Sequence, residues 1–322
     1  MQKYLFITTC GTSILSNNLS LEDRSKLTKL ANHHESEFST TEKTFIDDII
    51  NKKNIPTLAQ DLVKSKSACA ELNGIITFYN SQFSSNSSDL HFLMHTDTYQ
   101  GKKTVELLQS WLQEKNCNSN LLLIEDLNTK SLVDFKHGIS FLIHWCSQTL
   151  PGYRASGYKI IFNLSGGFKS LQGYMQTLGM LYADELLYIF ENNNELLRIP
   201  RLPLELDSSV VDAIKQNLST FRMLSNGLTL NKAAVANIAE TLFFEIGDEV
   251  ELSPWGQLGW ERFKKLYYAT KIYCPLEPIK LSDNATRDLQ KLPQFNFAFN
   301  QKMDTLYYYL KTQKHTRSVS VR

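Results

Sequence analysis

Short apolar runs alternate with longer segments of helical spacing through the first 200 residues, and this alternation constrains the fold more than any other feature. Between the runs, apolar residues recur every three to four positions over 58–79, 102–114, 131–148 and 170–183, which is the spacing of amphipathic helices. The apolar runs, rich in β-branched or aromatic residues, predict five strands: YLFITT, LHFLMH, NLLLIED, YKIIFNL and ELLYIF. Strands that alternate with helices predict an α/β fold with a Rossmann-like, mostly parallel sheet and flanking helices.

The pattern changes near Pro200, and we expect three consecutive parts. ENNNELLRIP predicts a turn and one more strand that closes a first domain, residues 1–200. Residues 201–278 have mostly helical spacing, as in LDSSVVDAIKQNLSTF, and we expect a helical connector. A last, small α+β unit is expected over residues 279–322. It begins IKLSDNATRDLQKLP, which predicts a short strand, a cap at Ser282 or Asp283 and a helix, and it ends on the strand-like TRSVSVR.

Composition narrows the class of protein. With 42% hydrophobic residues over 322 positions, the chain can bury large cores. No apolar run approaches the roughly 18 residues that span a bilayer, and MQKYLFITTCGTS lacks the long apolar centre of a signal peptide. We therefore expect a cytoplasmic protein with no membrane partner. Five scattered cysteines without a CxxC pair predict neither a disulfide framework nor a thiolate metal site.

Charge is uneven along the chain. The formal net charge is only +1, yet residues 279–322 contain eight Lys and Arg against three Asp, a balance of +5. A basic terminal unit is typical of proteins that bind nucleic acid, and it is equally typical of a solvated basic helix. Both interpretations of this end stay open on charge alone.

Two loops rich in small hydrogen-bond donors follow predicted strands. TTCGTS comes directly after the first strand, and NLSGGFKS comes after the fourth. In the second loop, Gly166 and Gly167 let a backbone approach a ligand closely, and Lys169 adds a positive charge at the start of a predicted helix. Because ligands of parallel α/β sheets bind beyond the carboxyl ends of the strands, we expect both loops to line one pocket for an anionic, phosphate-bearing ligand.

Neither loop matches a standard nucleotide-binding fingerprint. There is no GxGxxG after the first strand and no GxxxxGK[ST], which disfavours a dinucleotide or a Walker-type triphosphate. A third loop, HTDTYQGKKT, adds Thr96 and Asp97 as candidate ligand-binding residues. Each loop by itself is also compatible with an ordinary tight turn, so the prediction depends on their combination. We expect no cofactor.

The pairing of FITTCGTSIL with FNLSGGFKS resembles the CRISPR-associated Rossmann fold (CARF) sensor domains over residues 1–200. Members of that family bind cyclic oligoadenylates, most often cyclic tetra-adenylate, in a pocket shared by two subunits. The resemblance therefore implies a homodimer in which each subunit supplies the same loops to one half of the ring. It implies these binding residues: Thr9, Gly11, Thr12, Ser13, Asn163, Ser165, Gly166, Gly167, Lys169 and Ser170. Phe168 either stacks on an adenine or packs beneath the helix, and we favour packing.

The basic end resembles the start of a RelE-type mRNA interferase, which cleaves mRNA on the ribosome. The pattern is LSxxAxRDLxKL within residues 279–322. Enzymes of that type use Arg, Lys and Tyr from later strands to activate a 2′-hydroxyl and to stabilise the phosphorane. Those later strands are missing here, so the resemblance implies a truncated unit in which only Arg317 and Arg322 are candidate catalytic residues. The ribosome and mRNA are then the expected partners.

Three functions stay open on the sequence. The first is a sensor that binds cyclic tetra-adenylate and regulates the RelE-like ribonuclease. The second is a ring nuclease that cleaves its ligand in the sensor pocket, with Ser13 orienting a ribose 2′-hydroxyl and Lys169 offsetting charge in the transition state. The third is a transcription regulator with a helix-turn-helix over residues 207–250, although this segment is weakly basic at best.

Overall fold

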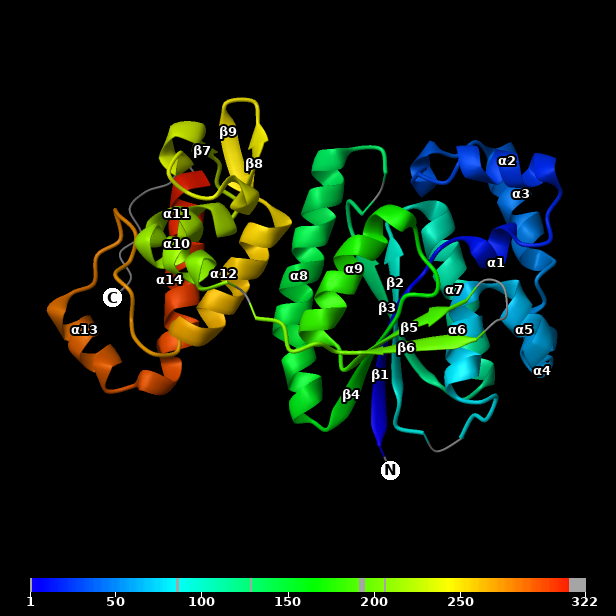
Figure 1. Cartoon of the computed structure of the whole chain (residues 1–322). Coiled ribbons are helices and arrows are strands. Elements are labelled where there is room, and N and C mark those ends of the chain that lie inside the picture. Colours follow the sequence, from blue (N-terminus) through cyan, green and yellow to red (C-terminus); the bar gives the residue numbers. More distant parts are fainter. Residues whose placement is uncertain (1, 85–86, 128, 191–194, 206, 313–322) are drawn as a thin grey trace. The chain divides into compact units, whose positions relative to one another are not determined.

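The computed structural model describes residues 2–84, 87–127, 129–190, 195–205 and 207–312 (Figure 1). The chain divides into two compact units, residues 1–205 and 206–322, which are described separately. Within the described residues, no helix is both long and apolar enough to cross a bilayer. The strand-like TRSVSVR at the end of the chain lies outside the described residues.

A six-stranded sheet forms the centre of the first unit. Its strands are β1 (Lys3–Thr9), β2 (Leu90–Thr96), β3 (Asn118–Ile124), β4 (Tyr158–Asn163), β5 (Glu185–Ile189) and β6 (Leu196–Pro200). They lie in the order β3-β2-β1-β4-β5-β6, and every pair is parallel except β5 with β6. The five predicted strands and the additional strand before Pro200 are confirmed, as is the mostly parallel sheet. The last strand is antiparallel because only a short hairpin connects it to β5.

Helices cover both faces of this sheet. Figure 1 shows α8 (Leu132–Ala155) and α9 (Lys169–Tyr182) over one face and α6 (Ala70–Phe78) and α7 (Tyr99–Glu114) over the other. The strand order changes direction between β1 and β4, since the chain adds strands on one side of β1 first and on the other side later. Such a switch point leaves a crevice between two diverging loops, the usual ligand site of open α/β sheets.

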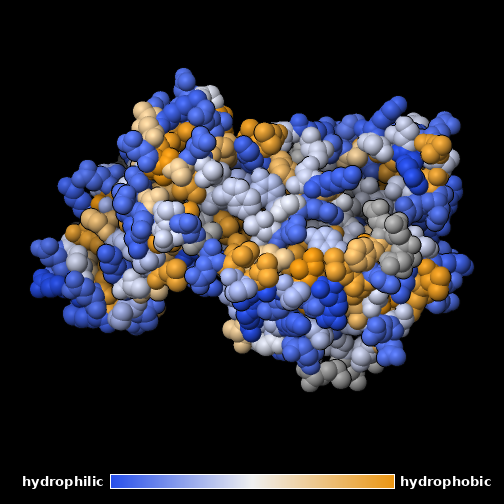
Figure 2. Space-filling model, in the orientation of Figure 1, coloured by the Kyte–Doolittle hydropathy of each residue, from blue (hydrophilic) through white to orange (hydrophobic). Residues whose placement is uncertain are grey.

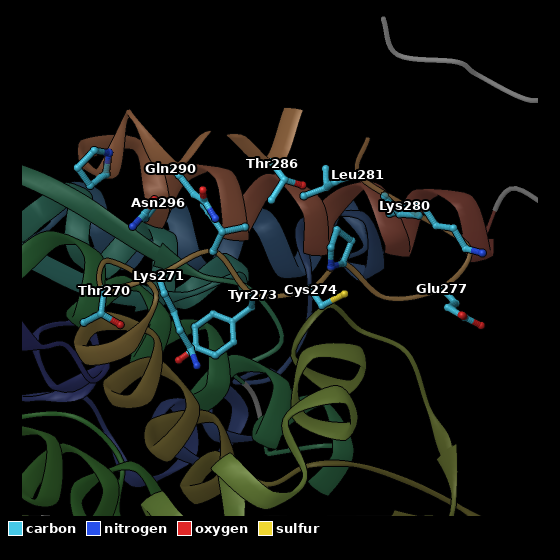
Figure 3. Close-up of a pocket in the computed structure, with 14 residues that line it drawn as sticks. Thr270, Lys271, Tyr273, Cys274, Glu277, Lys280, Leu281, Thr286, Gln290 and Asn296 are labelled. Atoms are coloured by element: carbon cyan, nitrogen blue, oxygen red, sulfur yellow. The ribbon is translucent and has the colours of Figure 1, made fainter. Parts of the chain in front are cut away.

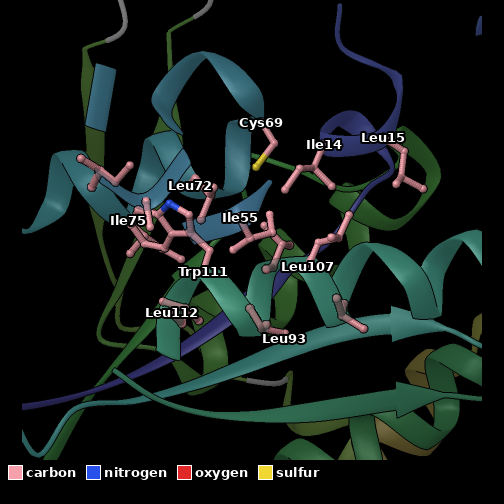
Figure 4. Packing of buried hydrophobic residues seen from close by; sticks show 14 of the residues in the cluster. Ile14, Leu15, Ile55, Cys69, Leu72, Ile75, Leu93, Leu107, Trp111 and Leu112 are labelled. Carbon is pink, nitrogen blue, oxygen red and sulfur yellow. The ribbon is translucent and has the colours of Figure 1, made fainter. Parts of the chain in front are cut away.

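A buried cluster holds α6 and α7 against β2 (Figure 4). Leu72 and Ile75 of α6 pack with Leu93 of β2 and with Trp111 of α7, and all four side chains are at most 1% exposed. The indole Nε1 of Trp111 donates a hydrogen bond to Ser65 Oγ at 2.9 Å. This core fixes α6, and therefore its first turn, relative to the sheet.

The chain between β1 and α6 forms a helical insertion. It contains α1 (Ser13–Ser16), α2 (Leu21–Lys29), α3 (Thr40–Asn51), α4 (Ile55–Gln60) and α5 (Leu62–Ala68). The single helix predicted over 58–79 is therefore wrong, because the segment breaks at Asp61 and Cys69. Asp61 adopts extended backbone angles and its side chain accepts from Lys64 N as the cap of α5, while Cys69 is extended with φ −161°.

Apolar side chains also reach the surface of the first unit near its edge strand. Figure 2 shows apolar surface over β6 and the segment that follows it. Phe190, Leu197, Leu202 and Leu204 are between 37% and 54% exposed. These residues flank an edge strand whose outer backbone groups have no strand partner among the described residues.

The second unit combines short helices with a small antiparallel sheet. The helices are α10 (Ser208–Gln216), α11 (Leu218–Ser225), α12 (Pro254–Tyr267), α13 (Asp283–Gln290) and α14 (Asn296–Thr312). The strands β7 (Leu230–Asn231), β8 (Phe243–Ile246) and β9 (Glu249–Leu252) lie in the order β7-β9-β8. The sheet was not predicted within the connector, although FFEIGDEVEL carries the signals of a hairpin: Gly247 has φ +63° in the tight turn between β8 and β9.

Two predictions about the end of the second unit have different outcomes. Ser282 caps α13, since its Oγ accepts from Ala285 N at 3.2 Å, so the predicted cap and helix are confirmed. The short strand expected at Ile279 is wrong. Its N–H donates to the Leu276 carbonyl at 3.0 Å and closes a turn, and no neighbouring strand is available among the described residues to form a ladder. The described part of the expected α+β unit is therefore helical.

Candidate ligand-binding site

The loops after β1 and β4 meet at the switch point of the sheet. Thr9, the last residue of β1, is fully buried, and its Oγ1 donates to the Gly166 carbonyl at 2.7 Å. A Cβ added to Gly11 would lie 3.1 Å from the backbone nitrogen of Gly167, so the two backbones are in close contact there. The structure thus brings together the two loops that the sequence singled out.

The Gly166-Gly167 pair makes this contact possible. A Cβ on Gly166 would lie 2.0 Å from Oε1 of Glu71, which leaves no room for any side chain. Gly167 has φ +96°, and a Cβ there would lie 3.0 Å from the Cβ of Thr9. The sequence analysis assigned both glycines to a ligand's close approach. In the structure, each allows a close approach within the protein, to Glu71 and to Thr9.

Glu71, in the first turn of α6, connects the two loops. Its Oε1 accepts the Gly11 N–H at 2.7 Å, and its Oε2 accepts from Ser13 Oγ at 3.0 Å. The side chain of Asn163, at the end of β4, donates to the Glu71 backbone carbonyl at 3.1 Å. Sequence reasoning missed Glu71. One signal was available, because Glu71 is the only charged residue between Lys66 and Asp89 and stands in a mostly apolar segment.

The environment of Glu71 shifts the pKa of its carboxyl. The residue is 1% exposed, and burial raises its pKa above the ordinary range, while the hydrogen bonds from Gly11 and Ser13 oppose that rise. Burial also raises the pKa of the neighbouring thiols of Cys10 and Cys69, and Glu71 adds to both increases. The two thiols are therefore neutral near pH 7, and the pKa of Glu71 lies above its ordinary value.

Other predicted residues reach solvent around this buried centre. Ser13 and Thr12 are half-buried at the start of α1, and Thr12 makes no capping hydrogen bond with its side chain. Lys169 and Ser170 are exposed in the first turn of α9. These four positions present donors and one cation beside the junction of the loops. Ser165 differs from them, because its Oγ is buried and has no hydrogen-bond partner among the described residues.

Phe168, immediately before α9, packs edge-on against Phe135 of α8, with ring centroids 6.1 Å apart. This contact lies on the α8 side of the loop. It agrees with the packing interpretation of Phe168 that the sequence analysis favoured.

The third loop is held by contacts within itself and by contacts of Asp97 with Asp126 and His34. Thr96 Oγ1 lies 2.7 Å from Thr98 Oγ1, and a Cβ on Gly101 would lie 2.5 Å from Thr96 Oγ1. Asp97 Oδ2 accepts from Asp126 N at 3.3 Å and lies 3.9 Å from Nδ1 of His34. Since β1 and β2 are neighbours, this loop follows the strand beside the first loop. Within the part of the chain that the structure describes, Thr96 and Asp97 make no hydrogen bond to Glu71.

The second unit contains a cavity of about 790 Å³ that the sequence analysis did not predict (Figure 3). Tyr273 and Cys274 line it from the segment after α12, and Thr286 and Gln290 line it from α13. Figure 3 shows these side chains on the two sides of the opening. The candidate ribonuclease residues Arg317 and Arg322 lie outside the described residues.

Comparison with known families concerns the first unit. Residues 66–202 match the family model described as CRISPR-associated protein (Cas_APE2256), a family of CARF-domain proteins. The matched segment runs from the helix before α6 to the residues just after β6. It includes Glu71 and the loop after β4, and it does not include the first loop or the second unit.

Proposed function

We propose that the first unit binds a cyclic oligoadenylate, and cyclic tetra-adenylate above others, at the loops that follow β1 and β4. The observation that carries this proposal is the junction of the two loops at the carboxyl edge of the sheet, through Thr9 with Gly166 and Gly11 with Gly167. The match of residues 66–202 to a CRISPR-associated family supports the same ligand class. The N-terminus of α9 and the Lys169 cation favour a phosphate there.

The proposal includes a homodimer around one ring. A ring of four identical nucleotides has two-fold symmetry, and so does an isologous dimer. Each subunit would supply Ser13 from its first loop and Lys169 from its second loop to one half of the ligand. Calorimetry of the protein with cyclic tetra-adenylate should then give one ring for every two chains.

Lys169→Ala is the direct test of the site. Because a lysine that contacts a phosphate contributes a charge-assisted hydrogen bond of about 1.5–3 kcal/mol, we expect affinity for cyclic tetra-adenylate to fall by roughly 10- to 100-fold. Lys29→Ala, an exposed lysine in the last turn of α2, is the matched control and should bind like the wild type. Equal affinities of the two variants in calorimetry would remove Lys169 from the site.

A second part of the proposal concerns the activity that the bound ring controls. We propose that the basic end acts as a RelE-like ribonuclease under control of the ring. The support is the LSxxAxRDLxKL pattern, which falls on α13 with Ser282 as its cap, together with the +5 charge of residues 279–322. Translating ribosomes with and without cyclic tetra-adenylate would test this. Cleavage of mRNA that depends on the ring would support the proposal, and intact mRNA in both samples would count against it.

A second candidate function for the same pocket is cleavage of the ring. The observation that favours it is the hydrogen bond between Ser13 Oγ and the buried carboxyl of Glu71, which leaves the oxygen of Ser13 free to accept from a ribose 2′-hydroxyl. Chromatography of the nucleotide after calorimetry separates the two functions. Intact rings indicate a sensor alone, and linear products indicate a ring nuclease.

A further inference from the structure

Resting on the proposed function, we propose that Glu71 is a positioning residue and the final proton acceptor for ring cleavage, acting through Ser13. Glu71 cannot touch a bound nucleotide itself, because its side chain is 1% exposed. Ser13 is half-buried and lies between Glu71 and solvent, with its Oγ 3.0 Å from Glu71 Oε2. A proton accepted at Ser13 therefore has a direct path to a buried base.

The direction of the hydrogen bond supports this role. Ser13 donates its hydroxyl proton to Glu71, so both lone pairs of Oγ are available to an incoming donor. The second carboxyl oxygen is held by the N–H of Gly11 at 2.7 Å. Gly166 packs directly on the carboxyl, since a Cβ at Gly166 would lie 2.0 Å from Oε1. The carboxyl thus has one fixed orientation, with Oε2 directed at Ser13.

A purely structural role does not require an acid at this position. The groups that stabilise the carboxylate are two backbone N–H groups, a hydroxyl and a thiol, which are all neutral. A glutamine would accept the Gly11 N–H equally well and would avoid the cost of burying a charge without a cation. An acid in such a place is typical of a group that exchanges a proton.

The proposed step is an internal transesterification. The ribose 2′-oxygen forms a bond to the adjacent phosphorus, and the bond from phosphorus to the 5′-oxygen breaks. The 2′-hydroxyl proton passes to Ser13 Oγ while the proton of Ser13 passes to Glu71 Oε2. The leaving 5′-oxygen takes a proton from water, and the hydroxide that this forms is neutralised by the proton that Glu71 returns through Ser13, which restores the carboxylate. The products are a 2′,3′-cyclic phosphate and a 5′-hydroxyl, and Lys169 offsets the charge that develops on the phosphorane.

The step predicts a pH dependence. The titratable side chains that interact with Glu71 are Cys10, after β1, and Cys69, before α6, and burial keeps both as thiols. Burial raises the pKa of Glu71, so the unprotonated acceptor becomes more abundant as the pH rises through that pKa. The cleavage rate should increase over the same interval and then level off.

The experiment measures binding and cleavage of cyclic tetra-adenylate by the full chain, with protein in excess over the ring and products separated by chromatography. Four proteins are compared: the wild type, Glu71→Gln, Ser13→Ala and Glu185→Gln. Glu185→Gln is the control and makes the same change at a carboxyl that pairs with Arg198 at 2.7 Å. Because Glu185 begins β5, which is parallel to β4, it lies at the amino ends of the strands, away from the two loops. Rates are measured from pH 5 to pH 9, a range chosen around neutrality.

We expect Glu71→Gln to bind the ring and to cleave it about 100-fold more slowly, with a rate that no longer rises with pH. Ser13→Ala should show the same loss, and the double variant should be no slower than either single variant. Glu185→Gln should cleave like the wild type. If Glu71→Gln does not fold, the proposal is still tested by Ser13→Ala, which leaves Glu71 in place and must lose the pH-dependent rise.

Several results would overturn the proposal. Cleavage by Glu71→Gln at the wild-type rate, or an unchanged pH profile in a folded Ser13→Ala variant, would exclude the relay. Wild-type protein that binds the ring and leaves it intact would also overturn it, while the proposed ligand stands. Wild-type protein that does not bind the ring at all would remove the proposed function and this inference together.

Discussion

At the scale of single residues, Glu71 determines how the two loops of the site are held. Its carboxyl accepts from Gly11 and Ser13 and is packed by Gly166, so three residues of the candidate site depend on one buried acid. Burial raises the pKa of this acid, which means that the folded protein holds a proton more tightly than the unfolded chain does. Stability should therefore depend on pH through Glu71.

We expect Glu71→Gln to change that dependence. With a raised folded-state pKa, the contribution of Glu71 to stability is fully present below the unfolded pKa of about 4.3 and is lost as the pH rises through the folded value. Glutamine does not titrate. The free energy of unfolding of the variant relative to the wild type should therefore increase with pH, by about 1.4 kcal/mol for each unit that separates the two pKa values. A constant difference between urea unfolding curves across pH 4 to 8 would contradict this.

Gly166→Ala tests the packing of the second loop on Glu71. The new methyl group would lie 2.0 Å from Oε1, so the loop or the acid must move, and we expect a loss of about 1–3 kcal/mol in the free energy of unfolding. Gly173→Ala in α9 is the control. No heavy atom lies within 4 Å of its added Cβ, and alanine in a helix should raise stability by about 0.5–1 kcal/mol. Equal effects of the two substitutions in chemical denaturation would show that Gly166 is not packed.

At the scale of elements, a buried ion pair joins α11 to α14 in the second unit. Arg222 Nε donates to Asp304 Oδ1 at 2.6 Å, and its Nη1 donates to the Cys274 carbonyl at 2.6 Å. The Tyr268 hydroxyl donates to the other oxygen of Asp304. Arg222 is 2% exposed and Asp304 is 3% exposed, so the pair is shielded from water. The guanidinium of Arg222 therefore stabilises the packing of α11 and α14 and does not face solvent.

Asp304→Asn should destabilise the second unit by about 3–5 kcal/mol, because it leaves the Arg222 charge buried without its counter-ion. Asp288→Asn is the control: its ion pair with Lys291 has a side-chain exposure above 70%, and its loss should cost less than about 1 kcal/mol. The comparison is made between the urea concentrations at which Asp304→Asn and Asp288→Asn are half unfolded. A small effect at Asp304 would mean that the pair contributes little to the fold.

At the scale of the whole molecule, each of the two compact units has buried hydrophobic residues of its own. Leu72 and Trp111 belong to the core of the first unit, and Phe221 and Trp260 belong to that of the second. We expect two unfolding transitions. A ligand stabilises the unit that binds it by RT ln(1 + [L]/Kd), about 2.7 kcal/mol at 100 times Kd. Cyclic tetra-adenylate should therefore raise the melting temperature of the transition in which the first unit unfolds.

The control for this measurement is a linear tetra-adenylate at the same concentration. Calorimetric scans of Asp304→Asn assign the transitions, because that substitution should lower the transition of the second unit. If the ring raised only the melting temperature at which the second unit unfolds, the binding site would lie outside the first unit.

The local pattern of the sequence was sufficient for the parallel sheet and for the position of the loops. Apolar runs such as YKIIFNL predicted the strands, and the alternation with helical segments predicted that both loops lie at the carboxyl edge. The cap at Ser282 also followed from residues next to it. These features could be predicted because side-chain periodicity and capping depend on neighbours in the chain.

Only the tertiary structure decided the interior of the site and the limits of several elements. Glu71 lies about 60 positions from the first loop and more than 90 from the second, and the packing of α6 on β2 and α7 brings it to both. The break at Cys69, which is buried in that core, and the pairing of β7 with β9 depend in the same way on distant partners. Contacts between remote segments are set by how the cores pack, which no local pattern records.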